Sequence, residues 1–266
     1  MMHTRIGTAF LSIVLFISLM MLNGCDNSAS QAQEQEQEQE LLLHGKTMGT
    51  TYNIKLYAPA ETLAKLNVHS DIEAALKEVN QSMSTYIPDS EINQFNRLTA
   101  DTIMPVSADF RTVVAESIRL GTSTKTLDVT MGPLIDLWGF GPDKRPTQRP
   151  SQDELDAMIA NIGVDKLMLN EQGLAKSVEG LELSFSATAK GFGIDKVAEL
   201  LERHGITSYL VEVGGETKIA GTKPDGKAWT IAIEKPVVDR REVQLILSPG
   251  NTGMATSGDY RNYFEE

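Results

Sequence analysis

One segment of the chain combines small residues, a lysine and the start of a helix, from which proteins often build phosphate sites. Residues 184–195 read Ser-Phe-Ser-Ala-Thr-Ala-Lys-Gly-Phe-Gly-Ile-Asp and lead into a helical pattern. Small residues just before a helix leave its first backbone amides open to an anion, and Lys190 adds a positive charge there. The Gly-x-Gly does not follow a strand with the spacing of a dinucleotide fold. The segment therefore predicts a phosphate contact where the helix begins.

Two further segments could meet a flat, partly polar ring. Met48 stands beside a glycine at the entrance to an expected strand, so a soft apolar side chain and a close backbone approach coincide. Asp128 lies between apolar residues, and Trp138 and Phe140 follow among glycines, so this stiff loop could present a carboxylate to a polar ring edge. Taken singly, the first segment is also explained as a strand start and the second as a core loop.

Three more segments are difficult to explain by packing alone. Residues 83–92 place Tyr86 at the end of one helix, just before the cap of the next, which also describes a plain connection with a half-buried tyrosine. Residues 211–216 form a buried-looking strand ending in two glycines, which suits close backbone packing. Residues 255–264 are polar and aromatic at once.

The composition excludes several classes of protein. The 266 residues include 24 Lys and Arg against 36 Asp and Glu, a formal net charge of -12, and 41% are hydrophobic. This apolar fraction is sufficient for a core, so the whole chain is neither disordered nor a coiled coil. The acidic balance argues against nucleic-acid binding, because such surfaces need clustered Lys and Arg. The single cysteine excludes a disulfide framework and cysteine-based zinc or iron–sulfur sites.

Residues 1–24 are predicted to be a secretory leader. Arg5 precedes an apolar run over residues 9–22, which is short for a membrane span and ends in small residues. The ending Leu-Asn-Gly-Cys resembles a bacterial lipobox, in which cleavage leaves Cys25 acylated at the new N-terminus; the alternative is an ordinary core cysteine. Two or three acyl chains anchor a protein stably. By resemblance to sorting in enteric-type bacteria, Asp26 indicates retention at the inner membrane, facing the periplasm.

The rest of the chain is expected to form a tether and one domain. Residues 25–40 include an alternating Gln-Glu tract over 33–40, which has nothing apolar to bury. It is predicted to be extended, although such a tract can also be helical. The globular domain is expected over residues 41–266.

Four helices are expected in the domain, over residues 70–83, 110–120, 151 to about 161, and 191–204. Capping boxes beginning at Ser70 and Ser151 predict where the first and third start. Gly121 and Gly205 are predicted to stop the second and fourth.

Strands dominate the last third of the sequence. They are expected there at 206–213, 217–220, 229–234, 243–247 and 259–264, and one earlier strand is expected at 52–57. A helix-rich first half followed by consecutive antiparallel strands predicts an α+β fold rather than a doubly wound sheet.

Taken in order, the six segments resemble the ApbE family, the FAD:protein FMN transferases once called thiamine biosynthesis lipoproteins. The likeness runs from about residue 45 to the end of the chain, and the leader agrees with it. It implies an ApbE-type α+β domain, similar to a T-fold, with a mostly antiparallel sheet and packed helices. It also implies a reaction in which FAD is cleaved with Mg²⁺, FMN is attached through its phosphate to a Thr or Ser of a flavoprotein, and AMP is released. Targets in the family include periplasm-facing subunits of sodium-pumping NADH:quinone reductases and of Rnf-type complexes.

The resemblance also assigns residues to the ligands. The positions matching the family's FAD contacts are Met48, Tyr86, Thr126, Leu127, Asp128, Ser184 and Lys190. Ala187 matches a metal-ligand position, where the donor must be its backbone carbonyl because alanine has no donor side chain. A hard oxygen ligand suits Mg²⁺.

The catalytic group itself is not identified. The family's other metal ligands, an Asp and a Thr, and a His of its catalytic region would follow Glu266, so the resemblance implies a truncated chain that is inactive alone. Asp259 and Arg261 are candidates to line the site, and an exposed cross-strand pair explains them equally. Two other functions stay open: an FAD pyrophosphatase yielding FMN and AMP, and a non-catalytic flavin-binding lipoprotein.

Overall fold

The computed structural model describes residues 38–65, 67–142, 149–237, 240 and 242–258. The predicted leader 1–24, Cys25, the predicted tether up to residue 37, and the expected strand 259–264 with Asp259 and Arg261 lie outside these ranges. In the part of the chain that is described, no helix has both the length and the apolar character needed to cross a membrane.

A five-stranded sheet forms the centre of the fold. Its strands, in spatial order, are β1 (Glu38–Thr47), β2 (Thr50–Pro59), β5 (Ser208–Val213), β6 (Glu216–Ala220) and β9 (Thr252–Met254). Every neighbouring pair is antiparallel, which together with the helices confirms the α+β prediction. Because β1 begins at Glu38, residues 38–40 of the expected tether belong to the sheet.

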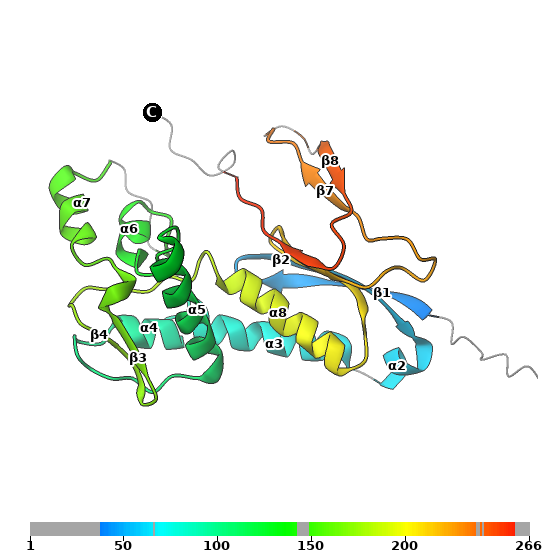
Figure 1. Ribbon diagram of the computed structural model, residues 1–266, viewed down its shortest axis with the longest axis horizontal. Coiled ribbons are helices and arrows are strands. Elements are labelled where there is room, and N and C mark those ends of the chain that lie inside the picture. Colours follow the sequence, from blue (N-terminus) through cyan, green and yellow to red (C-terminus); the bar gives the residue numbers. More distant parts are fainter. Residues whose placement is uncertain (1–37, 66, 143–148, 238–239, 241, 259–266) are drawn as a thin grey trace, which may run out of the picture. The chain divides into compact units, whose positions relative to one another are not determined.

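Two long helices cover one face of this sheet. α3 (Val68–Met83) and α8 (Ala189–Arg203) lie side by side along it (Figure 1). Alternate residues of β2 point toward the helices because successive side chains of a strand face opposite ways. The buried members are Leu43 of β1, Tyr52, Ile54, Leu56 and Ala58 of β2, Val68, Ile72 and Leu76 of α3, Ile194, Val197, Ala198 and Leu201 of α8, Ile206, and Tyr209, Val211 and Val213 of β5. We call this set the sheet core.

A second apolar cluster begins where α3 leaves the sheet. It is built from the end of α3, α4 (Glu91–Asn96), α5 (Ala108–Thr124), the hairpin β3 (Leu167–Asn170) and β4 (Gly173–Lys176), and the segment 181–185. The rings of Phe110 and Phe185 meet edge to face, with centroids 5.3 Å apart. We call this set the helical core. α3 contributes to both cores and therefore joins them.

The remaining elements are short. They are α2 (Ala60–Lys65), α6 (Gly132–Leu137), α7 (Gln152–Ile159), the 3₁₀ turn η1 (Val164–Lys166), and the hairpin β7 (Ile231–Glu234) with β8 (Val243–Leu247). The two strands of this last hairpin pair only with each other among the described strands.

Two predicted helix ends are wrong. α3 begins at Val68 after Asn67, because the buried Val68 extends the apolar face back by one turn, and Ser70 therefore lies inside the helix. α5 runs through Gly121 to Thr124. Gly121 packs closely, since a Cβ there would lie 2.8 Å from the Leu127 carbonyl oxygen. The glycine therefore permits a close approach and does not end the helix.

Other predicted ends are confirmed. Ser151 caps α7 through a complete capping box with Glu154. α8 ends at Arg203, and Gly205 follows with a φ of +75°, the left-handed conformation that favours glycine. The strands β5, β6, β7 and β8 lie within two residues of their expected bounds.

Candidate active site

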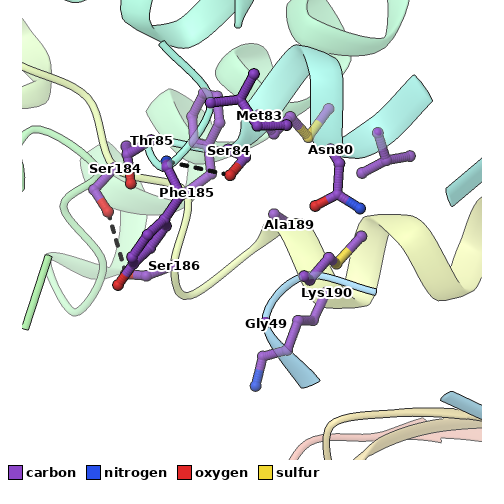
Figure 2. A pocket seen from close by; sticks show the side chains of 14 residues that line it. Gly49, Asn80, Met83, Ser84, Thr85, Ser184, Phe185, Ser186, Ala189 and Lys190 are labelled. Atoms are coloured by element: carbon purple, nitrogen blue, oxygen red, sulfur yellow. Dashed lines mark hydrogen bonds between the residues drawn. The ribbon is translucent and has the colours of Figure 1, made fainter. Parts of the chain in front are cut away.

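Four of the residues predicted to contact FAD line one cavity. Met48, Tyr86, Ser184 and Lys190 come from the β1–β2 turn, the segment after α3, the segment before α8 and the first turn of α8. The cavity has a volume of about 660 Å³ (Figure 2). Ligand pockets usually measure about 300–1,000 Å³, so this one has the size for a dinucleotide or a large part of one. The fold thus brings together positions that lie up to 142 residues apart (190 − 48) in the chain.

The β1–β2 turn fixes the position of Met48. The register pairs Thr47 with Thr50, which leaves Met48 and Gly49 as a two-residue hairpin loop. Both have left-handed φ angles, 50° and 71°. Such loops follow the twist of the two strands, but they usually carry Asn, Asp or Gly. Met48 is therefore in an uncommon conformation for its residue type, at the edge of the cavity.

Lys190 is held by an ion pair. Its Nζ lies 2.7 Å from Oε1 of Glu216 at the start of β6. The lysine side chain keeps 31% of its accessible surface and the glutamate side chain 17%. The other carboxylate oxygen of Glu216 is buried and has no hydrogen-bond partner among the described residues. The ammonium is thus partly neutralised, yet still borders the cavity.

The beginning of α8 suits an anion. Its N-cap residue, Thr188, makes no side-chain hydrogen bond to the first turn, although the amide of Ala189 already donates to the Phe185 carbonyl at 2.8 Å. A helix start carries partial positive charge, and Lys190 adds a full one. Figure 2 shows Lys190 extending along the side of the cavity where Gly49 lies. This arrangement agrees with the phosphate contact predicted from the sequence.

Ser184 is held from two sides. Its backbone amide donates to the Val129 carbonyl at 2.8 Å, and its hydroxyl donates to the Ser186 hydroxyl at 3.3 Å (Figure 2). The preceding residue, Leu183, exchanges two hydrogen bonds with the side-chain amide of Asn96. The segment before α8 is therefore fixed both to the loop after α5 and to the end of α4.

The residues Thr126, Leu127 and Asp128 lie outside the lining of this cavity. Leu127 packs on the helical core. Asp128 Oδ1 accepts from the backbone amide of Thr130 at 2.9 Å and from its hydroxyl at 2.5 Å. The Thr130 hydroxyl in turn accepts from the Gly163 amide at 2.7 Å. In this arrangement the Asp128 carboxylate organises its own loop.

The helix that follows this loop, α6, lines a second, smaller hollow of about 120 Å³. The hollow shares Thr85, Tyr86, Ser184 and Ser186 with the larger cavity, so the two adjoin. Its other walls include residues of α6, which follows the Asp128 loop directly. The sequence segment with Asp128, Trp138 and Phe140 therefore contributes to the site through its helix.

Comparison with known proteins identifies the family of the chain. Residues 48–266 match the ApbE family. The chain belongs to the ApbE family. It is 45% identical over 255 residues to the FAD:protein FMN transferase of Vibrio cholerae, covering 96% of this chain and 74% of that protein. It is 47% identical over 232 residues to the FAD:protein FMN transferase of Haemophilus influenzae, covering 84% and 67%. The solved flavinyl transferase ApbE of Pseudomonas stutzeri superimposes with a TM-score of 0.77 at 38% identity, covering 86% and 73%.

The described part of this ApbE chain does not form a complete metal site. Ala187 lies exposed in the turn before α8, where its carbonyl is the only donor that the residue offers. Among the described residues, no three His, Cys, Asp or Glu side chains gather where they could hold a metal ion. Mg²⁺ requires near-octahedral oxygen coordination, which a single carbonyl does not supply.

Sequence reasoning missed several residues of the site. Asn80 of the large cavity lay in no segment singled out from the sequence, and Met83, Ser84, Thr85 and Ser186 lay in such segments but were not assigned to a ligand. Asn80 donates to the Thr47 hydroxyl at 2.9 Å and to the Leu76 carbonyl at 3.0 Å, so it ties α3 to the residue before the β1–β2 turn. The sequence feature that could have identified Asn80 is an amide side chain beside the buried apolar residues Leu76, Val79 and Met83 of the same helix. Such an amide in a half-buried position has to find a partner.

Proposed function

We propose that this member of the ApbE family transfers FMN from FAD to a Thr or Ser hydroxyl of a target flavoprotein and releases AMP. The observation that carries the proposal is the cavity, which joins Met48, Tyr86, Ser184 and Lys190 in one place. Two relatives that share 45% and 47% identity with the chain are FAD:protein FMN transferases by name, and they support the same reaction.

The cavity offers different surroundings to the two kinds of group in FAD. Met48, Met83 and Phe185 give it apolar walls. The Tyr86 side chain is 66% exposed, so its ring is accessible for stacking on a flat ligand ring. Lys190 and the start of α8 provide positive charge for the pyrophosphate. A ligand with flat rings and a diphosphate matches this distribution.

The proposed reaction is a phosphoryl transfer. The acceptor oxygen forms a bond to the phosphorus on the FMN side, the bond from this phosphorus to the bridging oxygen breaks, and AMP leaves with that oxygen. The hydroxyl proton passes to a general base, and no described residue is assigned this role. Lys190 and the helix start would offset negative charge that develops on the phosphate oxygens. Mg²⁺ is part of the proposal, but no step is assigned to it because the described residues do not form its site.

The proposed place of action is the periplasmic face of the inner membrane, with Cys25 acylated, and the proposed acceptors are subunits of NADH:quinone reductases or Rnf-type complexes. The lipobox-like sequence before Cys25 supports the anchor. Replacing Cys25 with Ser should move the protein from the membrane to the soluble fraction or leave it uncleaved. Membrane association equal to that of the wild type in Cys25→Ser would contradict the anchor.

One assay separates the proposed function from its two alternatives. The protein is incubated with FAD, Mg²⁺ and an acceptor domain, and the products are separated by denaturing electrophoresis and by chromatography. From protein that includes the family's remaining metal ligands, we expect fluorescent flavin fixed to the acceptor, with one AMP released per flavin. Free FMN with AMP and no labelled acceptor would indicate a pyrophosphatase instead. Bound but unchanged FAD would indicate a flavin-binding protein, so FAD binding is measured in parallel.

A further inference from the structure

Gly193 lies in α8 directly against the side chain of Met48. A Cβ atom on Gly193 would come within 2.6 Å of Met48 Cε and 3.8 Å of its Sδ. Gly193 is buried, and its φ angle is not positive. The position therefore does not require the conformational freedom of glycine, which costs stability inside a helix. What it requires is the absence of a side chain.

The position of Met48 is constrained by its backbone and by its packing. The two-residue turn between β1 and β2 holds its backbone in the left-handed conformation. Its side chain packs against both the sheet core and the helical core and also borders the large cavity. The space over Gly193 receives the end of this side chain. The Met48 thioether is thus fixed by its turn at one end and by α8 at the other.

We propose that Gly193 is a positioning residue for flavin binding. Because glycine has no side chain, it leaves a space on α8, the socket, that holds the end of the Met48 side chain and keeps Met48 at the cavity wall. The inference rests on the proposed function in that the ligand is FAD. Methionine is flexible, so it adapts when its socket is filled. A methyl group on Gly193 would therefore push the Met48 methyl out of the socket and change the cavity wall, while the backbone of α8 stays in place.

This reasoning gives Gly193→Ala an unusual combination of effects. Alanine favours the helix over glycine, and the atom that must yield is the far end of a flexible side chain. We expect a melting temperature no lower than that of the wild type. We expect FAD affinity to fall about fivefold, the scale of one lost contact between a methionine sulfur and a ring. A merely structural role would lower the melting temperature and the affinity together.

A double-mutant cycle with Met48→Ala tests whether Gly193 acts through Met48. FAD dissociation constants are measured by quenching of flavin fluorescence for the wild type, Gly193→Ala, Met48→Ala and the double variant. If Gly193 acts through Met48, Gly193→Ala should weaken binding in the wild type and have no further effect in Met48→Ala. An equal loss in both backgrounds, or no loss in the wild type, would overturn the inference.

A second measurement does not depend on FAD. The Met48 methyl signal is followed by NMR in protein labelled with ¹³C at the methionine methyl groups. This signal is assigned as the one that is absent from the spectrum of Met48→Ala. Gly191→Ala is the matched control. Gly191 lies on the same helix, and a Cβ there would meet nothing within 4 Å. The signal should move in Gly193→Ala and stay in Gly191→Ala. An unmoved signal in Gly193→Ala overturns the inference whether or not the wild type binds FAD. A wild type that binds no FAD overturns the proposed function and with it the role in flavin binding, but a signal that still moves would leave the contact between Gly193 and Met48 in place.

Discussion

The side-chain amide of Asn96 pairs with the backbone of Leu183 as a neighbouring strand would. Its Nδ2 donates to the Leu183 carbonyl at 3.0 Å, and its Oδ1 accepts from the Leu183 amide at 2.8 Å. Leu183 is buried and directly precedes Ser184 of the cavity. The last residue of α4 therefore positions a wall of the large cavity although it does not line that cavity itself.

Replacing Asn96 with Ala should reduce both stability and FAD affinity. Two buried backbone groups would lose their partners, which predicts a loss of about 1–3 kcal/mol in the free energy of unfolding, measured by urea denaturation. Asn96→Asp keeps the shape and the acceptor but loses the donor, so its loss should be smaller. A stability of Asn96→Ala equal to that of the wild type would show that the segment does not depend on this amide.

Changes at Lys190 and Glu216 should separate ligand binding from stability. Lys190→Ala removes a charge from the cavity and should weaken FAD binding about tenfold or more. It also leaves the largely buried Glu216 carboxylate without its ion-pair partner, which should lower the melting temperature. Adding Glu216→Gln should restore the melting temperature but not FAD affinity. Recovery of FAD affinity in the double variant would argue against a phosphate contact by Lys190.

Two substitutions at Asp128 distinguish its loop contacts from a contact with FAD. Asp128→Ala removes the acceptor for Thr130, so the free energy of unfolding should fall by about 1–3 kcal/mol. Asp128→Asn keeps an oxygen for Thr130 and should be closer to the wild type in stability. If the carboxylate also contacts FAD, as the resemblance predicts, both variants lose FAD affinity. Unchanged dissociation constants in both would exclude that contact.

The protein should lose stability in alkaline solution through two buried tyrosines. The Tyr52 hydroxyl donates to Glu73, the Tyr209 hydroxyl donates to Glu202 at 2.5 Å, and burial, followed by these carboxylates, raises both pKa values above the ordinary 10.0. A folded-state pKa above the unfolded value contributes stability that is fully present below the unfolded pKa and is lost as pH rises beyond it.

The measurement is the melting temperature as a function of pH. The contribution of these tyrosines should be constant from neutral pH to about pH 9 and decline above pH 10. Tyr52→Phe and Tyr209→Phe should each make the alkaline decline shallower. The same slope in the wild type and both variants would mean that other groups cause the alkaline loss.

The sequence predicted those elements whose ends carry their own local chemistry. Ser151 and Glu154 satisfy each other's backbone groups at the start of α7, so the capping box alone located it. The Ser70 box failed because burial of Val68 decided the start of α3, and burial depends on the sheet that the helix meets. Likewise, the polar Gln-Glu tract concealed the start of β1, whose first residues gain their hydrogen bonds from β2.

The site was predictable where a motif had a distinctive composition. Met48 beside a glycine and Lys190 after small residues were identifiable from the sequence, and the fold places both at one cavity. The partners of Asn80 and Asn96 were not identifiable. The role of these two residues depends on Thr47 and Leu183, which lie far from them in the chain, and no local pattern announces such a pairing.

The packing of Met48 against both cores also links local opening of the cores to ligand binding. Opening of either core exposes one side of this residue, so the cavity wall is complete only when both cores are closed. A ligand that binds only the complete wall stabilises that closed state by mass action. Saturating FAD should therefore slow amide hydrogen exchange not only near α8 but also in α4 and α5, which border the other core. Binding of FAD to one cavity would thus suppress local opening in both the sheet core and the helical core.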